Sequence, residues 1–149
     1  MEELSLTERN REVNRHNPFV QLVGVEIAEV VRDRSRLRLT IRPDSLNPHG
    51  LVHGGALFTL ADNAAGCAAS TDGRTYVTQG GDIHFLRAQA SGTVEAAARV
   101  VHRGRSTVLV EVSLFGEEDR LMATASFSYF CVDGSEIDRN SPARAAGRS

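Results

Sequence analysis

Residues 53–70, HGGALFTLADNAAGCAAS, constrain the fold of this chain more than any other segment. The segment is too long for a single strand and contains good helix formers, so we expect a helix. Apolar and small residues occupy every face, and such a helix is buried on all sides rather than lying on a surface. Several small residues would let a β-sheet approach closely: Ala56, Ala61, Ala64, Ala65, Gly66, Ala68 and Ala69.

Strand-like segments lie on both sides of this helix in the chain. Before it, alternation begins near residue 25, and in residues 36–42 three apolar side chains alternate with arginines, as in a half-buried antiparallel strand. After it come four segments at about 75–88, 93–102, 106–115 and 121–131. Their short connections predict an antiparallel meander.

This element order predicts one domain of α+β class, in which an antiparallel sheet curls around a central buried helix. One side of the sheet would stay uncovered in a monomer, and a partner could cover it. At the ends of the chain, Ser5 and Glu8 fit a capping box for a charged, loosely held helix within residues 1–16. Residues 133–149 have almost nothing apolar, and we expect a disordered tail there.

Composition excludes several classes of protein. Apolar residues make up 41% and the net charge is −2, which argues against a disordered chain and against nucleic acid as a partner. No apolar stretch is long enough to span a membrane, and residues 1–16 lack the apolar core of a signal peptide. Cys67 and Cys131 belong to no CxxC motif, so we expect reduced thiols and a cytoplasmic location.

Asp62 is the sharpest chemical signal. It is the only carboxylate between Asp44 and Asp72, and it lies in the middle of the apolar helix. A buried, unpaired carboxylate costs several kcal/mol, so the position needs a reason. One reason is structural, a loop cap or an ion pair with an arginine. The other is a nucleophile or general base in a mostly apolar pocket.

Gly54 and Gly55 stand at the expected start of the same helix. A helix N-terminus exposes unpaired N–H groups with partial positive charge, and glycine lets a ligand approach the backbone. Eight residues of helix, about 12 Å, separate Gly54 from Asp62, so the two cannot touch within one helix. The alternative is a helix start with flexible glycines.

Two other groups of residues carry weaker signals. His49 and His53 have metal-ligand spacing, but the helix start falls between them, and we expect no metal site. Arg103-Gly104-Arg105 occupies a tight hairpin, where the arginines are either solvated charges or phosphate contacts.

Together these residues resemble the hotdog-fold acyl-CoA thioesterases of the phenylacetate-degradation type. The family pattern N-x-x-G-x-x-H-G-G-x-x-x-x-L-x-D is complete over residues 47–62. The resemblance covers roughly residues 17–132, which would form the thioesterase domain, with residues 1–16 as an N-terminal extension. It implies hydrolysis of acyl-CoA without any further cofactor, in a homotetramer built as a dimer of dimers with active sites at the dimer interface.

The resemblance also implies a role for individual residues. Asp62 would be the nucleophile or general base, and the Gly54 N–H would polarise the thioester carbonyl with help from His53. Asn47 of the other protomer would orient the thioester or water, and Thr78 would hold the water.

Substrate contacts follow from the same resemblance. They would come from Phe85 and from the loop that meets the CoA nucleotide, His102, Arg103, Gly104, Arg105, Ser106 and Thr107. Gly80-Gly81 departs from the family pattern by interrupting a strand that is usually continuous, and a bulge there could widen the acyl pocket. Ala88 stands where the family often has proline.

Two other functions compete with hydrolysis. A non-catalytic acyl-CoA-binding module could keep the same fold, although the complete set of Asp62, Gly54, Asn47 and Thr78 favours an enzyme. A hotdog dehydratase or hydratase would need a His-centred acid–base pair in a different motif, which the sequence lacks.

Overall fold

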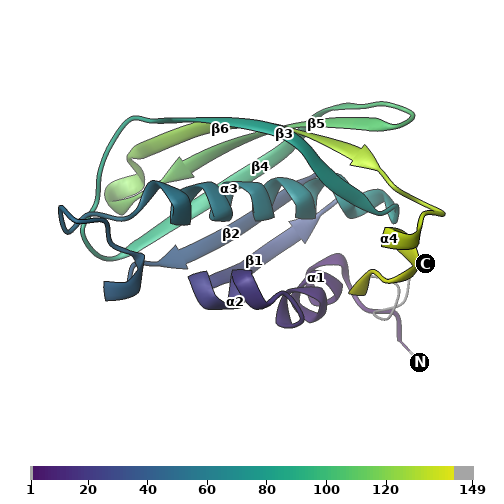
Figure 1. Cartoon of the computed structure of the whole chain (residues 1–149), viewed down its shortest axis with the longest axis horizontal. Coiled ribbons are helices and arrows are strands. Elements are labelled where there is room, and N and C mark those ends of the chain that lie inside the picture. The colour runs from purple at the N-terminus through teal and green to yellow at the C-terminus, as the bar shows by residue number, and fades with distance from the viewer. Residues whose placement is uncertain (1, 143–149) are drawn as a thin grey trace.

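The computed structural model describes residues 2–142 and shows one long helix lying along a curved sheet (Figure 1). The helices are α1 (Leu6–Arg15), α2 (Pro18–Val23), α3 (Gly54–Ala69) and α4 (Glu136–Arg139). The strands are β1 (Val25–Val31), β2 (Arg34–Thr40), β3 (Tyr76–Phe85), β4 (Thr93–Arg103), β5 (Thr107–Phe115) and β6 (Leu121–Cys131). Within residues 2–142, no helix has the length and apolar character needed to cross a bilayer.

The core lies between α3 and the sheet, which confirms the predicted α+β hotdog architecture. The helix residues facing the sheet are completely buried: Leu60, Ala61, Ala64, Ala65, Ala68 and Ala69. Alternate residues of the strands meet them, among them Leu37 and Leu39 of β2, while the arginines between them point outward. The expectation of burial on all sides was too strong, because the helix face that carries Thr59, Asp62 and Gly66 is half-exposed in the single chain.

The predicted four-strand meander was wrong for its first strand. All pairs are antiparallel, but the sheet order is β1-β2-β4-β5-β6-β3, so β3 pairs with β6 at one edge and β4 lies beside β2. Residues 86–92 connect β3 to β4 across the end of the sheet. At one end of this segment the Leu86 N–H donates to the carbonyl of Met122 in β6, and at the other end the carbonyl of Gly92 accepts from the N–H of Ile41, which follows β2. Three strand spacings are about 14 Å, which seven extended residues span easily.

The N-terminal helix covers the β1 edge of the sheet. The Ser5–Glu8 capping box is present, as predicted. However, α1 is tied firmly to β1: Thr7 Oγ1 bonds both the N–H and the carbonyl of Val30, and the Arg11 guanidinium donates to the carbonyls of Ile27 and Ala28. These polar side chains occupy backbone groups that an edge strand otherwise leaves unpaired.

The expected disordered tail is ordered over the part that the structure describes. Ser135 caps the short helix α4, and Asp138 is completely buried. The Asp138 carboxylate accepts hydrogen bonds from Thr75 Oγ1 at 2.5 Å and from Gly134 N–H at 3.0 Å. Polar anchoring of this kind leaves no apolar pattern in the sequence. Residues 143–149 of the expected tail lie outside the described residues.

The predicted bulge in β3 lies at Gln79, directly before Gly80 and Gly81, which both pair with β6. The pairing of β3 with β6 slips between Thr78 and Gly80. At Gly81 a Cβ atom would lie 2.3 Å from Cδ1 of the Phe127 ring, which is fully buried. Only glycine fits at position 81 without displacing that ring, so the missing side chain of Gly81 leaves room for Phe127.

Candidate active site

Asp62 carries its carboxylate on the half-exposed face of α3, opposite β3 and β6. Its Oδ1 atom accepts a hydrogen bond from Thr78 Oγ1 at 2.9 Å and another from the Tyr129 hydroxyl at 2.5 Å. Within residues 2–142, Asp62 forms no ion pair with any arginine or histidine. The structure therefore does not show the ion pair with an arginine that was the structural alternative for Asp62. An accessible carboxylate held by neutral hydroxyls has lone pairs available for chemistry.

Tyr129 is the residue that the sequence reasoning missed. It alternates along β6 with Ala123, Ala125 and Phe127 on the apolar face of the strand, and it is 3% exposed. Its hydroxyl reaches α3 and also lies 2.6 Å from the main-chain carbonyl oxygen of Asp62. The available signal was a polar atom on an otherwise apolar strand face. Buried tyrosine hydroxyls usually find a partner, and Asp62 was a candidate.

The start of α3 brings Gly54, His53 and Phe85 together. His53 is the N-cap, and its Nδ1 accepts from the Gly55 N–H at 2.8 Å. The Gly54 N–H has no hydrogen-bond acceptor among the described residues. A Cβ at Gly54 would lie 3.1 Å from the Phe85 ring, so that ring lies directly over the glycine. The site thus offers one unpaired N–H at a helix N-terminus beside an aromatic surface.

Asn47 shapes the loop that leads into α3. Its Oδ1 accepts from the N–H groups of His49 at 2.9 Å and Leu51 at 3.2 Å. This is ordinary loop chemistry for asparagine. The Nδ2 amide has no partner within residues 2–142, and it is the part of the side chain left for a ligand. No group of three or more His, Cys, Asp or Glu side chains in that range could hold a metal ion.

Arg103 does not lie exposed in its turn, and the expectation that it meets a nucleotide phosphate needs correction. Its guanidinium forms ion pairs with Asp33 at 2.7 Å and with Asp72 at 2.9 Å. It also donates to the carbonyls of Ala68 and Ala69 at the C-terminus of α3. All three guanidine nitrogens are engaged, so Arg103 caps the helix and ties it to the β1–β2 turn.

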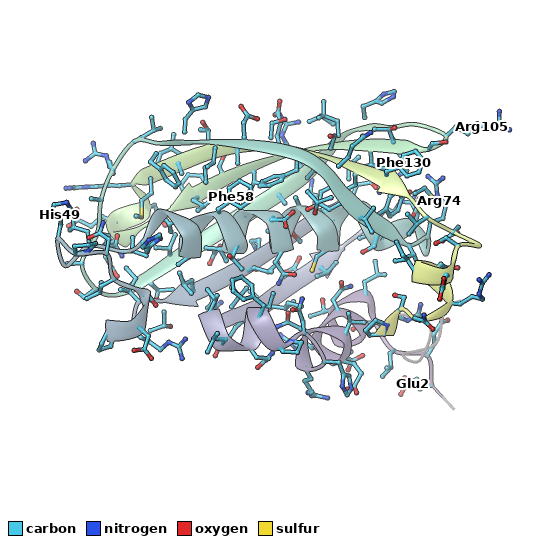
Figure 2. The ribbon with its side chains drawn as sticks, viewed as in Figure 1. Glu2, His49, Phe58, Arg74, Arg105 and Phe130 are labelled. Atoms are coloured by element: carbon cyan, nitrogen blue, oxygen red, sulfur yellow. The ribbon has the colours of Figure 1, made fainter. Side chains whose placement is uncertain are left out.

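The rest of the predicted nucleotide loop lies in the β4–β5 hairpin. His102, Arg105, Ser106 and Thr107 are exposed, and the Arg105 side chain extends away from the body of the molecule (Figure 2). Arg74 holds the hairpin tip by donating to the carbonyl oxygens of Gly104 at 3.3 Å and Arg105 at 2.7 Å. Figure 2 places this hairpin and His49 at opposite ends of the molecule.

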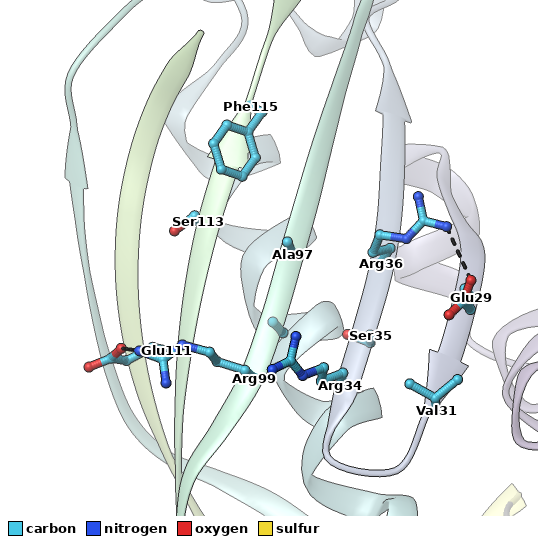
Figure 3. A pocket seen from close by; sticks show the side chains of 11 residues that line it. Glu29, Val31, Arg34, Ser35, Arg36, Ala97, Arg99, Glu111, Ser113 and Phe115 are labelled. Atoms are coloured by element: carbon cyan, nitrogen blue, oxygen red, sulfur yellow. Dashed lines mark hydrogen bonds and ion pairs between the residues drawn. The ribbon is translucent and has the colours of Figure 1, made fainter. Parts of the chain in front are cut away.

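A hollow of about 410 Å³ lies on the outer face of the sheet, away from Asp62 (Figure 3). Arg36 and Arg99 line it, and each is paired with a glutamate, Glu29 and Glu111 respectively. Its other lining residues come from β1, β2, β4 and β5: Val31, Arg34, Ser35, Ala97, Ala98, Ser113 and Phe115. None of the predicted site residues lines this hollow.

Comparison with known proteins identifies the family. A sequence model of the thioesterase superfamily matches residues 49–123. The acyl-coenzyme A thioesterase PaaI of Escherichia coli (strain K12) is 30% identical over 102 residues, which cover 68% of this chain and 73% of that protein. The structure of the E. coli PaaI protein from the phenylacetic acid degradation operon matches with a TM-score of 0.77 and 26% identity, covering 88% of this chain and 99% of that one.

Two further solved structures have a similar fold. Conserved protein PA5202 from Pseudomonas aeruginosa has a TM-score of 0.74 and 32% identity, covering 76% of this chain and 93% of that one. A hypothetical thioesterase protein with coenzyme A from Streptococcus pneumoniae TIGR4 has a TM-score of 0.70 and 29% identity, covering 73% and 86% of the two chains. The chain therefore belongs to the thioesterase superfamily and is a PaaI-like thioesterase with the hotdog fold.

Proposed function

We propose that this chain hydrolyses acyl-CoA thioesters to a free acid and CoA, with Asp62 as the nucleophile or general base. The observation that carries the proposal is the Asp62 carboxylate, which lies on an accessible helix face and is held by two hydroxyls, with no cation from residues 2–142 paired to it. The names of similar proteins support the substrate class, since one is an acyl-coenzyme A thioesterase and another a 1,4-dihydroxy-2-naphthoyl-CoA hydrolase.

The start of α3 would polarise the thioester. The Gly54 N–H is unpaired among the described residues and lies at the positive end of the helix dipole, which suits a carbonyl oxygen that gains negative charge in the transition state. His53 supports this arrangement by engaging the neighbouring Gly55 N–H. The Asn47 Nδ2 would donate to the thioester or to water, Thr78 would hold the water near Asp62, and Phe85 would contact the acyl group.

A complete site needs two copies of the chain. Gly54 and Asp62 are about 12 Å apart along one helix, too far to act on the same carbonyl. The two edges of the sheet differ, because α1 covers β1 whereas the ten-residue edge strand β3 is mostly exposed. An open edge strand of this length pairs readily with another strand. We propose that two copies join at β3, that each dimer holds two shared sites, and that two dimers form a homotetramer.

The exposed hairpin is the proposed contact for the CoA nucleotide. Arg105 offers a guanidinium without an ion pair among residues 2–142, and His102, Gly104, Ser106 and Thr107 surround it in the same hairpin. Arg103 is left out of this set because its donors are engaged in the interior.

We expect hydrolysis to need no metal ion, since the proposed steps use only the carboxylate, an amide and a backbone N–H. Activity that chelation abolishes and zinc restores would contradict this.

A cytoplasmic location is proposed as well. Cys67 and Cys131 are both free, as is usual in a reducing compartment.

A panel of acyl-CoA substrates tests the proposal. The enzyme should release free CoA thiol from at least one aryl, short-chain or long-chain acyl-CoA, and the panel would also identify the acyl preference. The competing function is a non-catalytic acyl-CoA-binding module. Tight binding of several acyl-CoAs without any thiol release would favour that module and overturn the enzyme.

A further inference from the structure

The two oxygens of the Asp62 carboxylate have different surroundings. Both hydroxyl donors, Thr78 and Tyr129, lie on Oδ1. No residue within 2–142 donates to Oδ2. An ionised carboxylate has about four lone-pair positions, and the pair on Oδ2 is left for a ligand or water. Among the described residues, Oδ1 is therefore the hydrogen-bonded oxygen of Asp62 and Oδ2 is the oxygen without a donor.

The two donors also differ in how firmly they are held. Thr78 is exposed on the edge strand β3, next to the bulge. Tyr129 is 3% exposed in the interior strand β6. Its ring packs against Gly66, one helical turn beyond Asp62, and lies 6.5 Å from the ring of Phe127. A phenol confined in this way has little freedom to move away from the carboxylate.

Tyr129 also remains a donor over the pH range in which enzymes work. Burial and the negative charge of Asp62 raise the pKa of the Tyr129 phenol well above its ordinary value. The hydroxyl therefore keeps its proton. The hydroxyl oxygen lies within hydrogen-bond distance of both Oδ1 and the main-chain carbonyl of Asp62, and a carboxylate is a stronger acceptor than an amide carbonyl.

We propose that Tyr129 is a positioning residue that anchors Asp62 through Oδ1 so that Oδ2 faces the reacting thioester. The inference rests on the proposed thioesterase function. It applies equally if Oδ2 attacks the thioester carbon or takes a proton from water, since both steps need the oxygen with free lone pairs.

The chain supplies a matched control, because it has two tyrosines and both bond a carboxylate. The hydroxyl of Tyr76 donates to Asp72 Oδ2 at 2.7 Å, in the network around Arg103 and away from Asp62. Tyr129→Phe and Tyr76→Phe each remove one oxygen atom and keep the ring. The experiment measures kcat, KM and thermal unfolding for both variants and the wild type with an acyl-CoA that the panel identifies.

We expect Tyr129→Phe to lower kcat by about tenfold to 100-fold, because a small misplacement of a reacting group costs that much in rate. Its KM should stay within about twofold, since ground-state binding does not use Oδ1. Tyr76→Phe should keep the wild-type kcat per folded molecule.

Three results would overturn the inference. Tyr129→Phe with wild-type kcat in a folded, active enzyme would show that Asp62 is positioned without it. An equal loss of kcat in both tyrosine variants would show a general effect of stability. A wild-type protein that hydrolyses no member of the panel would overturn the proposed function itself, and the inference with it.

Discussion

At the scale of single residues, the proposed catalytic role of Asp62 can be tested by one substitution. Asp62→Asn is close to isosteric and removes the charge that attack or proton abstraction requires. We expect kcat to fall by about 10²–10⁴-fold or more, with acyl-CoA binding and thermal stability nearly unchanged. Thiol release, calorimetric binding and thermal unfolding on one preparation measure these quantities. A stable Asp62→Asn protein with full activity would remove the centre of the proposed mechanism.

Gly81 and Gly80 offer a second test at this scale, with one residue as the control for the other. Gly81→Ala would place a Cβ against the buried ring of Phe127, and we expect a loss of about 1–3 kcal/mol in the free energy of unfolding. Gly80→Ala meets only Ser128 Oγ at 3.6 Å, an ordinary contact, and should cost much less. Urea unfolding compares them, and equal losses would mean that the Phe127 ring yields easily.

At the scale of elements, we expect the two arginines of the β4–β5 hairpin to act differently, Arg103 on stability and Arg105 on substrate binding. Arg103→Ala should lower the free energy of unfolding by about 2–3 kcal/mol, because it removes the cation that joins Asp33 to Asp72 and the donor that binds the carbonyls of Ala68 and Ala69. Arg105→Ala should leave stability unchanged and raise the KM for acyl-CoA severalfold with little change in kcat. An unchanged KM in Arg105→Ala would place the CoA nucleotide elsewhere.

The same network predicts how stability depends on acidity. Burial acts to raise the pKa of Asp72, but hydrogen bonds from Tyr76 and Arg74 and the charge of Arg103 outweigh it, so the pKa lies below the ordinary value of 3.8. A carboxyl with a depressed pKa in the folded state stabilises the fold above about pH 4, and this contribution is lost as the pH falls further.

Asp72→Asn tests this sign. The variant should be less stable than the wild type near neutral pH, and the difference in the free energy of unfolding should shrink below about pH 4 as Asp72 becomes protonated in the wild type. Chemical unfolding at a series of pH values measures the difference. A gap that stays constant into acid would mean that the ionised form of Asp72 contributes nothing.

At the scale of the whole molecule, the site is expected to be shared between copies of the chain. Asn47→Ala and Asp62→Ala should each be inactive alone. When the two are mixed and exchange subunits, half of the dimers are mixed, and one of the two sites in each has both residues intact. We expect recovery of about a quarter of the wild-type activity. No recovery after mass spectrometry has shown exchange would contradict the shared site, and light scattering should show a tetramer.

Much of this molecule was predictable from local patterns. The limits of α3 follow from a run of small and apolar residues after His53-Gly54, and the alternation in β2 identifies its buried face at Leu37 and Leu39. Asp62 can be singled out from the sequence because burying a charged side chain in an apolar helix costs free energy in any tertiary structure. Such features depend on spacing along the chain, which a sequence contains completely.

Tertiary structure decided what depends on distant partners. The alternation of residues 121–131 is enough to put Tyr129 on a buried face, but only the packing of β6 on α3 brings its hydroxyl to Asp62. Arg103 looked like a surface turn residue, and its side chain turns inward because Asp33 and Asp72, 70 and 31 residues away, meet at the end of α3. The pairing of β3 with β6 likewise has no local signal, since short connections favour neighbours. A sequence shows which groups need partners, and the fold decides which of them meet.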